Sequence, residues 1–261
     1  MFFYEKFIGL LLPAIIAGSL FAQNDPDSVI ASKRENQVNI KRNGYSLNYK
    51  NLIVPAVFIG YGIAGLKIDA LKDLNASTRD EILEDRPKRK NWDNYTQYIP
   101  VILVYGLDAA GIKTKHNFKD RTIIYATSQL ISGAFVLPLK HIIKEERPDS
   151  SNNMSFPSGH TATAFSSAHF MFREYMDKNL WLSLSGYAFA IFTGVYRAIN
   201  NKHFIGDIVA GAGFGILSTE LSYRLYPKIN SLFSRKREIT STMLMPVYQN
   251  KSFGIGVVKN F

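Results

Sequence analysis

Apolar residues gather in six stretches of the chain, each separated from the next by a polar or charged segment. Their lengths and their content of Leu, Ile, Ala, Gly and Phe predict helices. Most are shorter than the roughly 20 residues that a straight membrane span needs, and several contain Ser, Thr or Gln. The stretches are residues 52–66, 98–112, 122–139, 161–172, 180–195 and 204–217. We therefore expect an all-α protein, a helical bundle of short apolar helices.

The hydropathy pattern fits a membrane bundle and also a soluble helical domain, because the mean hydropathy is only −0.05. We favour membrane association. Basic side chains crowd a loop and the tail: Lys113, Lys115, Lys119 and Arg121, then Lys228, Arg235, Lys236 and Arg237. By the positive-inside tendency both segments are cytoplasmic. Residues 140–160 and 197–207 then face the periplasm, provided that residues 52–66 do not cross the membrane.

The two ends of the chain differ from this bundle. Residues 1–22 have the pattern of a secretory signal peptide, with Lys6 before an apolar run and Ala22 after it; an uncleaved anchor is the alternative. Residues 240–261 alternate weakly and contain Gly254 and Gly256, which suits a hairpin or an ordered tail. The charged segment 79–94 is expected to be a loop. The predicted parts are a signal peptide or anchor (1–22), an N-terminal extension with one apolar helix (23–97), the bundle (98–226) and a C-terminal tail (227–261).

Composition narrows the classes of partner. The chain has 31 Lys and Arg against 21 Asp and Glu, a net charge of +10, which favours phosphates, acidic lipid surfaces or nucleic acid. The basic residues form no long run with interleaved aromatic residues, so we predict no nucleic-acid partner. The absence of cysteine excludes disulfides, Cys-ligated zinc and thiol catalysis.

Three polar clusters lie at ends of the apolar stretches. In the first, Arg147 follows Lys140 by two helical turns, so both can face one ligand if the helix persists. Pro148 favours an extended conformation at Arg147 and hence a helix end near it. A guanidinium binds phosphate oxygens in pairs and a lysine adds a point charge. Alone, this cluster fits a surface charge run, with Lys144 and Glu145 in a solvated helix end.

The second cluster is Pro157, Ser158, Gly159 and His160, which opens the stretch 161–172. A helix start presents free N–H groups, so the Ser158 hydroxyl and the Ser158 and Gly159 amides could donate to an anion, and His160 could transfer a proton. The same residues also fit a turn followed by a helix cap. The remaining histidines of the helical segments are expected to be structural: His116, His141 and His169.

The third cluster contains Arg197, His203 and Asp207. His203 and Asp207 are four residues apart, which predicts one face of a helix. A carboxylate there can hold one imidazole nitrogen as N–H and leave the other free to attack, although a lone pair of this kind fits a helix-start salt bridge equally well. Together the clusters supply three cations and one carboxylate, which suits an anion. We therefore predict no metal and no other cofactor.

The three clusters resemble the signature of the type 2 phosphatidic acid phosphatase superfamily. Its parts are Lys-x6-Arg-Pro, Pro-Ser-Gly-His and Ser-Arg-x5-His-x3-Asp. Residues 140–148 and 157–160 match the first two in full, and the third matches from Arg197 to Asp207 except that Tyr196 replaces the usual Ser. The resemblance covers about residues 122–220. Residues 94–100 and 156–165 also look like a bacterial exported branch that includes lipid A phosphatases.

This resemblance implies a metal-independent phosphatase on a helical bundle. By carry-over, His203 is the nucleophile that forms a phosphohistidine, Asp207 orients it, and His160 protonates the leaving alcohol. The family's phosphoryl-binding groups correspond to Lys140, Arg147, Ser158, Gly159 and Arg197. Phosphoryl transfer depends on charge stabilisation and an in-line nucleophile, which these residue types supply.

The leading hypothesis is a lipid phosphate phosphatase at the periplasmic face of an inner membrane. Candidate substrates are undecaprenyl diphosphate, phosphatidylglycerophosphate or a lipid A phosphate, and no obligatory protein partner is evident. One alternative is a soluble periplasmic acid phosphatase of broad specificity. A second is a vanadate-dependent haloperoxidase on the same fold, and a third is a non-catalytic anion-binding membrane protein.

Overall fold

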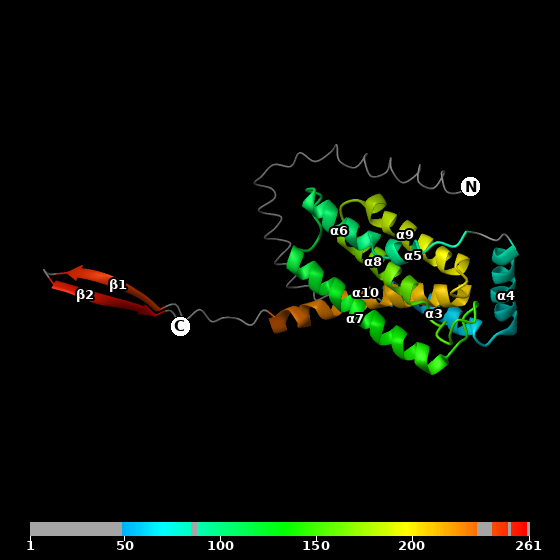
Figure 1. Ribbon diagram of the computed structural model, residues 1–261. Helices are drawn as coiled ribbons and strands as arrows, with labels where there is room; N and C mark the ends of the chain where they lie inside the picture. The colour runs from blue at the N-terminus through cyan, green and yellow to red at the C-terminus, as the bar shows by residue number, and fades with distance from the viewer. Residues whose placement is uncertain (1–48, 85–87, 234–241, 250–251, 260–261) are drawn as a thin grey trace. The chain divides into compact units, whose positions relative to one another are not determined.

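The computed structural model describes residues 49–84, 88–233, 242–249 and 252–259 (Figure 1). The signal peptide or anchor predicted for residues 1–22 lies outside this part. The helices are α3 (Tyr49–Gly65), α4 (Asp69–Glu84), α5 (Asp93–Thr96), α6 (Ile99–Ala109), α7 (Phe118–Ile143), α8 (Gly159–Tyr175), α9 (Leu180–Ile199) and α10 (Ile205–Phe233). The predicted helical bundle is confirmed, and each of the six apolar stretches lies mostly within one helix.

The chain divides into two compact units, Met1–Pro227 and Lys228–Phe261. The second unit contains an antiparallel hairpin of β1 (Thr242–Gln249) and β2 (Ser252–Lys259), with Thr242 opposite Lys259 and Gln249 opposite Ser252. This pairing confirms the hairpin expected from the weak alternation of the tail.

Helix α8 is the central helix of the first unit and packs on α6, α7 and α9 (Figure 1). Its buried positions are rich in small residues, among them Ala162, Ala164, Ser166 and Ala168. Small side chains let neighbouring backbones approach closely. The first turn of α8 carries Gly159 and His160, so this packing fixes the position of the second polar cluster.

Helix α10 approaches its neighbours through glycines. A Cβ at Gly211 would lie 2.5 Å from the Ser158 carbonyl oxygen, and one at Gly215 would lie 2.8 Å from the Ser166 nitrogen. On another side, a Cβ at Gly213 would lie 2.8 Å from the Pro55 carbonyl oxygen of α3. Any larger residue at these positions would force the helices apart. The glycines therefore set how closely the first turn of α10, with Asp207, lies against the start of α8.

Two of the described helices, α7 and α9, are long and apolar enough to cross a membrane; α3 and α4, bent by 88° at their junction, pass the same test only as a pair. Both long helices present large apolar side chains outward, including Leu130 and Ile142 on α7 and Trp181 on α9. This exposure is typical of helices that face lipid. The charged segment 79–94, expected as a loop, is helical as far as Glu84 and again from Asp93, so that expectation was wrong at both ends of the segment.

Two of the remaining histidines are buried in polar networks at a distance from the three clusters. His116 Nδ1 lies 2.7 Å from Glu174 Oε1, which also accepts a hydrogen bond from the Tyr223 hydroxyl at 2.6 Å. His169 Nε2 lies 2.7 Å from Glu220 Oε1. These contacts link loops and helices of the bundle, in keeping with the structural roles expected for both histidines.

Candidate active site

His203 and Asp207 lie together at the start of α10. The distance from His203 Nδ1 to Asp207 Oδ2 is 3.5 Å, and their side chains are 1% and 2% exposed. His203 precedes the helix, so the two do not share a helix face as the spacing predicted. Asp207 is in the first turn and accepts the Phe204 N–H at 3.0 Å, the reach-back contact of a capping box. The helix cap therefore holds the carboxylate beside the imidazole.

Burial in this pocket changes the protonation of His203. Burial lowers the pKa of His203 to about 4 against the opposing effect of Asp207, and Arg197 and Lys140 lower it further. The imidazole is therefore neutral at pH 7. A proton on Nδ1 faces Asp207, which leaves Nε2 with a free lone pair.

The Pro-Ser-Gly-His turn lies directly against Asp207. The Ser158 N–H donates to the Asp207 carbonyl oxygen at 3.0 Å, so this amide, predicted to donate to an anion, has a partner within the protein. The Ser158 hydroxyl lies 2.9 Å from the Thr161 hydroxyl and is fully buried. A Cβ at Gly159 would lie 3.9 Å from Lys140 Cε. The turn therefore lies against both Lys140 of the first cluster and Asp207 of the third.

The three predicted cations surround the turn. Helix α7 ends at Ile143 with Lys144 in the left-handed conformation, so the helix does not persist from Lys140 to Arg147. Lys140 Nζ instead reaches the carbonyl oxygens of Met154 and Ser155, at 2.7 and 3.2 Å. Arg147 and Arg197 each have a buried Nε with no hydrogen-bond partner among the described residues. Unsatisfied buried donors are costly, and an anion between the arginines would satisfy both.

His160 lies in the first turn of α8 and contacts the segment before α6. Its Nε2 is 2.8 Å from Asn94 Oδ1. Burial and the neighbouring Arg197 lower the pKa of His160 to about 4, against a raising effect of Asp93 and with further lowering by Arg147 and Lys140. Arg197, Arg147 and Lys140 therefore all lower the pKa of His160. Arg197 and Lys140 also lower the pKa of His203. All eight predicted site residues lie in this region of the bundle.

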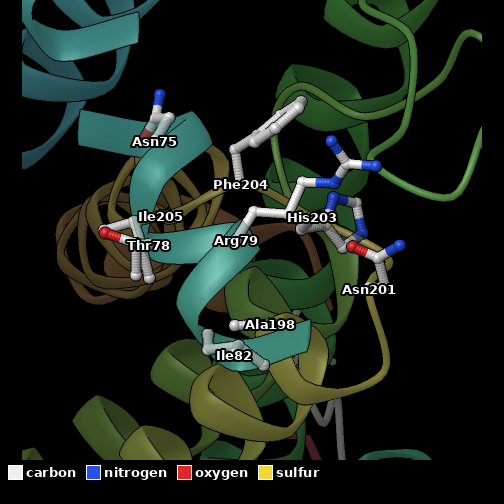
Figure 2. Close-up of a pocket in the computed structure, with 9 residues that line it drawn as sticks. All are labelled: Asn75, Thr78, Arg79, Ile82, Ala198, Asn201, His203, Phe204 and Ile205. Carbon is white, nitrogen blue, oxygen red and sulfur yellow. The ribbon is translucent and has the colours of Figure 1, made fainter. Parts of the chain in front are cut away.

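A small pocket opens beside His203 on the side of α4 (Figure 2). Asn75 of α4 also accepts the Gly206 N–H at 3.1 Å, which ties α4 to the start of α10. The pocket is lined by Asn75, Thr78, Arg79, Ile82, Ala198, Asn201, His203, Phe204 and Ile205. The N-terminal extension therefore forms part of the wall around His203.

Residues 121–231 match the model of the PAP2 superfamily. This segment of the chain is similar to the PAP2 superfamily. It includes Lys140, the Pro-Ser-Gly-His turn and Asp207, so the family assignment based on the three clusters is confirmed.

A curated relative extends this result. The chain is 36% identical over 132 residues to the lipid A 1-phosphatase of Porphyromonas gingivalis, a match that covers 50% of this chain and 30% of that protein. The chain thus spans less than a third of the relative's length. No solved structure matches the chain.

Two side chains of this PAP2 segment that the sequence did not single out contact Asp207. The Ser155 hydroxyl donates to Asp207 Oδ2 at 2.5 Å and lies 3.5 Å from His203 Nδ1. Glu145, expected in a solvated helix end, is instead half-buried and hydrogen-bonded to Asp207, with Oε2 unpartnered among the described residues. Burial first, and then Asp207, raise the pKa of Glu145 to about 9. At pH 7 Glu145 is therefore protonated and shares its proton with Asp207.

Glu145→Gln should change how stability depends on pH. An unfolded glutamate titrates near pH 4.3, so between there and pH 9 the folded protein holds a proton that the unfolded chain has released. The contribution of Glu145 to stability is therefore greatest at acid pH and falls as the pH rises. Glutamine can donate to Asp207 and does not ionise. The thermal unfolding midpoint should be measured at pH 5, 7 and 9. The midpoint of the variant should rise relative to that of the wild type as the pH rises.

Glu146→Gln is the matched control for this measurement, because Glu146 is the adjacent glutamate and is exposed. Its unfolding midpoints should run parallel to those of the wild type across the pH series. Parallel curves for Glu145→Gln as well would contradict a shared proton between Glu145 and Asp207.

Proposed function

We propose that this protein hydrolyses phosphate monoesters or diphosphates of a lipid through a covalent phosphohistidine. The observation that carries the proposal is a neutral His203 backed by Asp207, with Arg147 and Arg197 in the same region each keeping a buried Nε donor that has no partner among the described residues. An anion would satisfy the donors, and a neutral imidazole backed by a carboxylate is a nucleophile. Similarity to the PAP2 superfamily and to a protein named lipid A 1-phosphatase supports a phosphatase that acts on a lipid.

In the first step, His203 Nε2 attacks phosphorus and the bond from phosphorus to the ester oxygen breaks. Asp207 stabilises the positive charge that forms on the imidazole ring, because its carboxylate faces Nδ1. Lys140, Arg147 and Arg197 stabilise the phosphoryl oxygens, with the Ser158 hydroxyl and the Gly159 amide as further donors. These groups would stabilise the negative charge of the transition state.

His160 acts at the other end of the broken bond. A bound phosphate brings negative charge next to the imidazole, which raises its pKa from the low value that burial and Arg197 produce. The protonated ring then donates to the departing alcohol. In the second step, neutral His160 accepts a proton from water as the water attacks the phosphohistidine, so phosphate is released and His203 is regenerated.

We place the reaction at the periplasmic face of an inner membrane. The apolar surfaces of α7 and α9 support membrane association. The signal-like residues 1–22 and the basic loop and tail support export and this orientation. Carbonate washing of membranes should leave the protein in the membrane fraction. Recovery in the soluble fraction, with fast turnover of small esters, would favour the acid phosphatase alternative.

Phosphate release from a panel of lipid phosphates in EDTA tests the function and its independence of metals together. The panel contains a lipid A phosphate, phosphatidylglycerophosphate and undecaprenyl diphosphate, with p-nitrophenyl phosphate as the small ester. We expect release from at least one lipid at a kcat/KM well above that for the small ester, and no effect of EDTA. No release from any of the four compounds would contradict the proposed function.

A further inference from the structure

The short helix α5 and the residues around it contact two of the predicted site residues from outside the segment that matches the PAP2 model. Its first two residues, Asp93 and Asn94, are adjacent in the chain and reach different partners. Asp93 Oδ2 accepts a hydrogen bond from Arg197 Nη1 at 2.6 Å, and Asn94 Oδ1 lies 2.8 Å from His160 Nε2. One turn of backbone thus contacts a predicted phosphoryl-binding cation and the predicted general acid.

Helix α5 is held in place by contacts with α9 and within its own turn. It packs on α9, which carries Arg197, and the Thr96 hydroxyl lies 2.8 Å from the Thr193 hydroxyl of that helix. The Gln97 side chain donates to the Asn94 carbonyl oxygen at 2.9 Å. The positions of Asp93 and Asn94 are therefore fixed relative to α9.

Asp93 is 1% exposed and both of its carboxylate oxygens have partners. Oδ2 pairs with Arg197, and Oδ1 accepts from Asn200 Nδ2 at 3.0 Å. The contact occupies Nη1 of the guanidinium and leaves Nε buried and unpartnered among the described residues. A planar guanidinium held at one nitrogen is restrained in orientation. Asp93 thus determines which edge of Arg197 remains available to a ligand.

Asn94 acts on the proton of His160. An amide oxygen only accepts hydrogen bonds, so it favours the ring forms that carry a proton on Nε2, including the doubly protonated form. The charged groups that act on this ring are Arg197, Arg147 and Lys140, which disfavour its protonation, and Asp93, which favours it. Asn94 is exposed, so its contact with His160 lies at the solvent side of the site.

We propose that Asp93 and Asn94 are positioning residues of the site, Asp93 by orienting Arg197 and Asn94 by holding the Nε2 proton of His160. The inference rests on the proposed function, in which Arg197 binds the phosphoryl group and His160 is the general acid. It adds a part of the site that lies outside residues 121–231.

The sharpest test uses two substitutions of Asn94 with opposite expected effects. Asn94→Asp places a negative charge next to His160 and should raise its pKa, whereas Asn94→Leu removes the acceptor and should lower it. Because the general acid must be protonated, the alkaline limb of the pH profile of kcat/KM should move to higher pH in Asn94→Asp and to lower pH in Asn94→Leu. A merely structural residue would not shift the limb in opposite directions.

Histidine NMR distinguishes failure of this inference from failure of the proposed function. The protein has five histidines, and His160→Gln assigns the His160 signal in labelled protein in micelles. Opposite shifts of its titration midpoint in the two Asn94 variants would support the contact even if the wild type released no phosphate. Unchanged midpoints in both variants would overturn the role of Asn94, whatever the activity.

Asp93→Asn tests the second contact. It keeps an acceptor of the same size and removes the charge, so we expect a higher KM and a lower kcat, with about a tenfold or greater loss of kcat/KM. Asp93→Asn and Arg197→Lys together should lose less than the product of the single losses, because both changes disturb one contact. A double variant whose loss of kcat/KM equals the product of the two single losses would overturn the role of Asp93.

Asp108→Asn is the matched control for Asp93→Asn. Asp108 of α6 pairs with Arg121 in the first turn of α7 at 2.8 Å, and neither residue belongs to the three clusters. This control should change the thermal midpoint and leave kcat/KM near the wild-type value. A loss of kcat/KM in Asp108→Asn as large as in Asp93→Asn would show that any broken acid–arginine pair has the same effect, which would contradict a specific role for Asp93.

Discussion

Replacing His203 by glutamine should reduce phosphate release by on the order of 10³-fold or more, because the variant has no group that can form the phosphoenzyme. Glutamine is close in size to histidine and can still donate to Asp207, so the first turn of α10 should keep its cap. Rates should be measured with the best lipid phosphate of the panel at saturating concentration. Rapid quenching in base with radiolabelled substrate should trap a phosphohistidine in the wild type and none in the variant, and the label should be lost when the trapped protein is acidified.

His141→Gln is the matched control for His203→Gln, because His141 is an exposed histidine in the last turn of α7, next to Lys140 in the chain. It should release phosphate at the wild-type rate. Wild-type activity in His203→Gln would remove His203 as the nucleophile. If neither the wild type nor the variant released phosphate while both bound it, the third alternative, an anion-binding protein, would explain the cluster of cations.

The sequence predicts the helices of the bundle well because their main determinant is local. Each apolar stretch is long enough to favour helix, and the turn at Pro157 and the caps at Asn117 and Asn179 are set by neighbouring residues. Helix α4 was missed because it has few apolar residues. It depends on contacts that no short window of sequence contains, such as Asn75 with the Gly206 N–H.

The three clusters could be predicted because their residue types and spacing are specific, but the contacts that tune them could not. Glu145 lies in a charged run, so the sequence predicts that it is exposed to solvent. In the fold it is half-buried and hydrogen-bonded to Asp207. Arg121 belongs to a basic segment expected as a loop, and it is instead buried in the first turn of α7, paired with Asp108. In both cases the protonation or partner of a charged residue depends on residues distant in the sequence.

The close approach of α10 to α8 accounts for the second large effect that we expect, a loss of stability in Gly215→Ala. A Cβ there would lie 2.8 Å from the Ser166 nitrogen and would overlap the Ala162 carbonyl oxygen. Both are backbone atoms of α8, so no side chain can move aside and the helices must separate. Overpacking of this kind costs about 1–3 kcal/mol, which corresponds to about 2–12 °C in the unfolding midpoint of a domain of this size.

Gly106→Ala on α6 is the matched control for this prediction, because the same substitution there should not lower the unfolding midpoint. A Cβ at Gly106 meets no atom of the described residues within 4 Å. Alanine is favoured over glycine in a helix by up to about 1 kcal/mol, so Gly106→Ala should leave the midpoint unchanged or raise it. Both variants should be compared with the wild type by thermal unfolding in the same detergent. Equal midpoints for the two variants would contradict the close packing of α10 on α8. Separation of these helices would also move His160 away from Asp207, so phosphate release should fall in Gly215→Ala and not in Gly106→Ala.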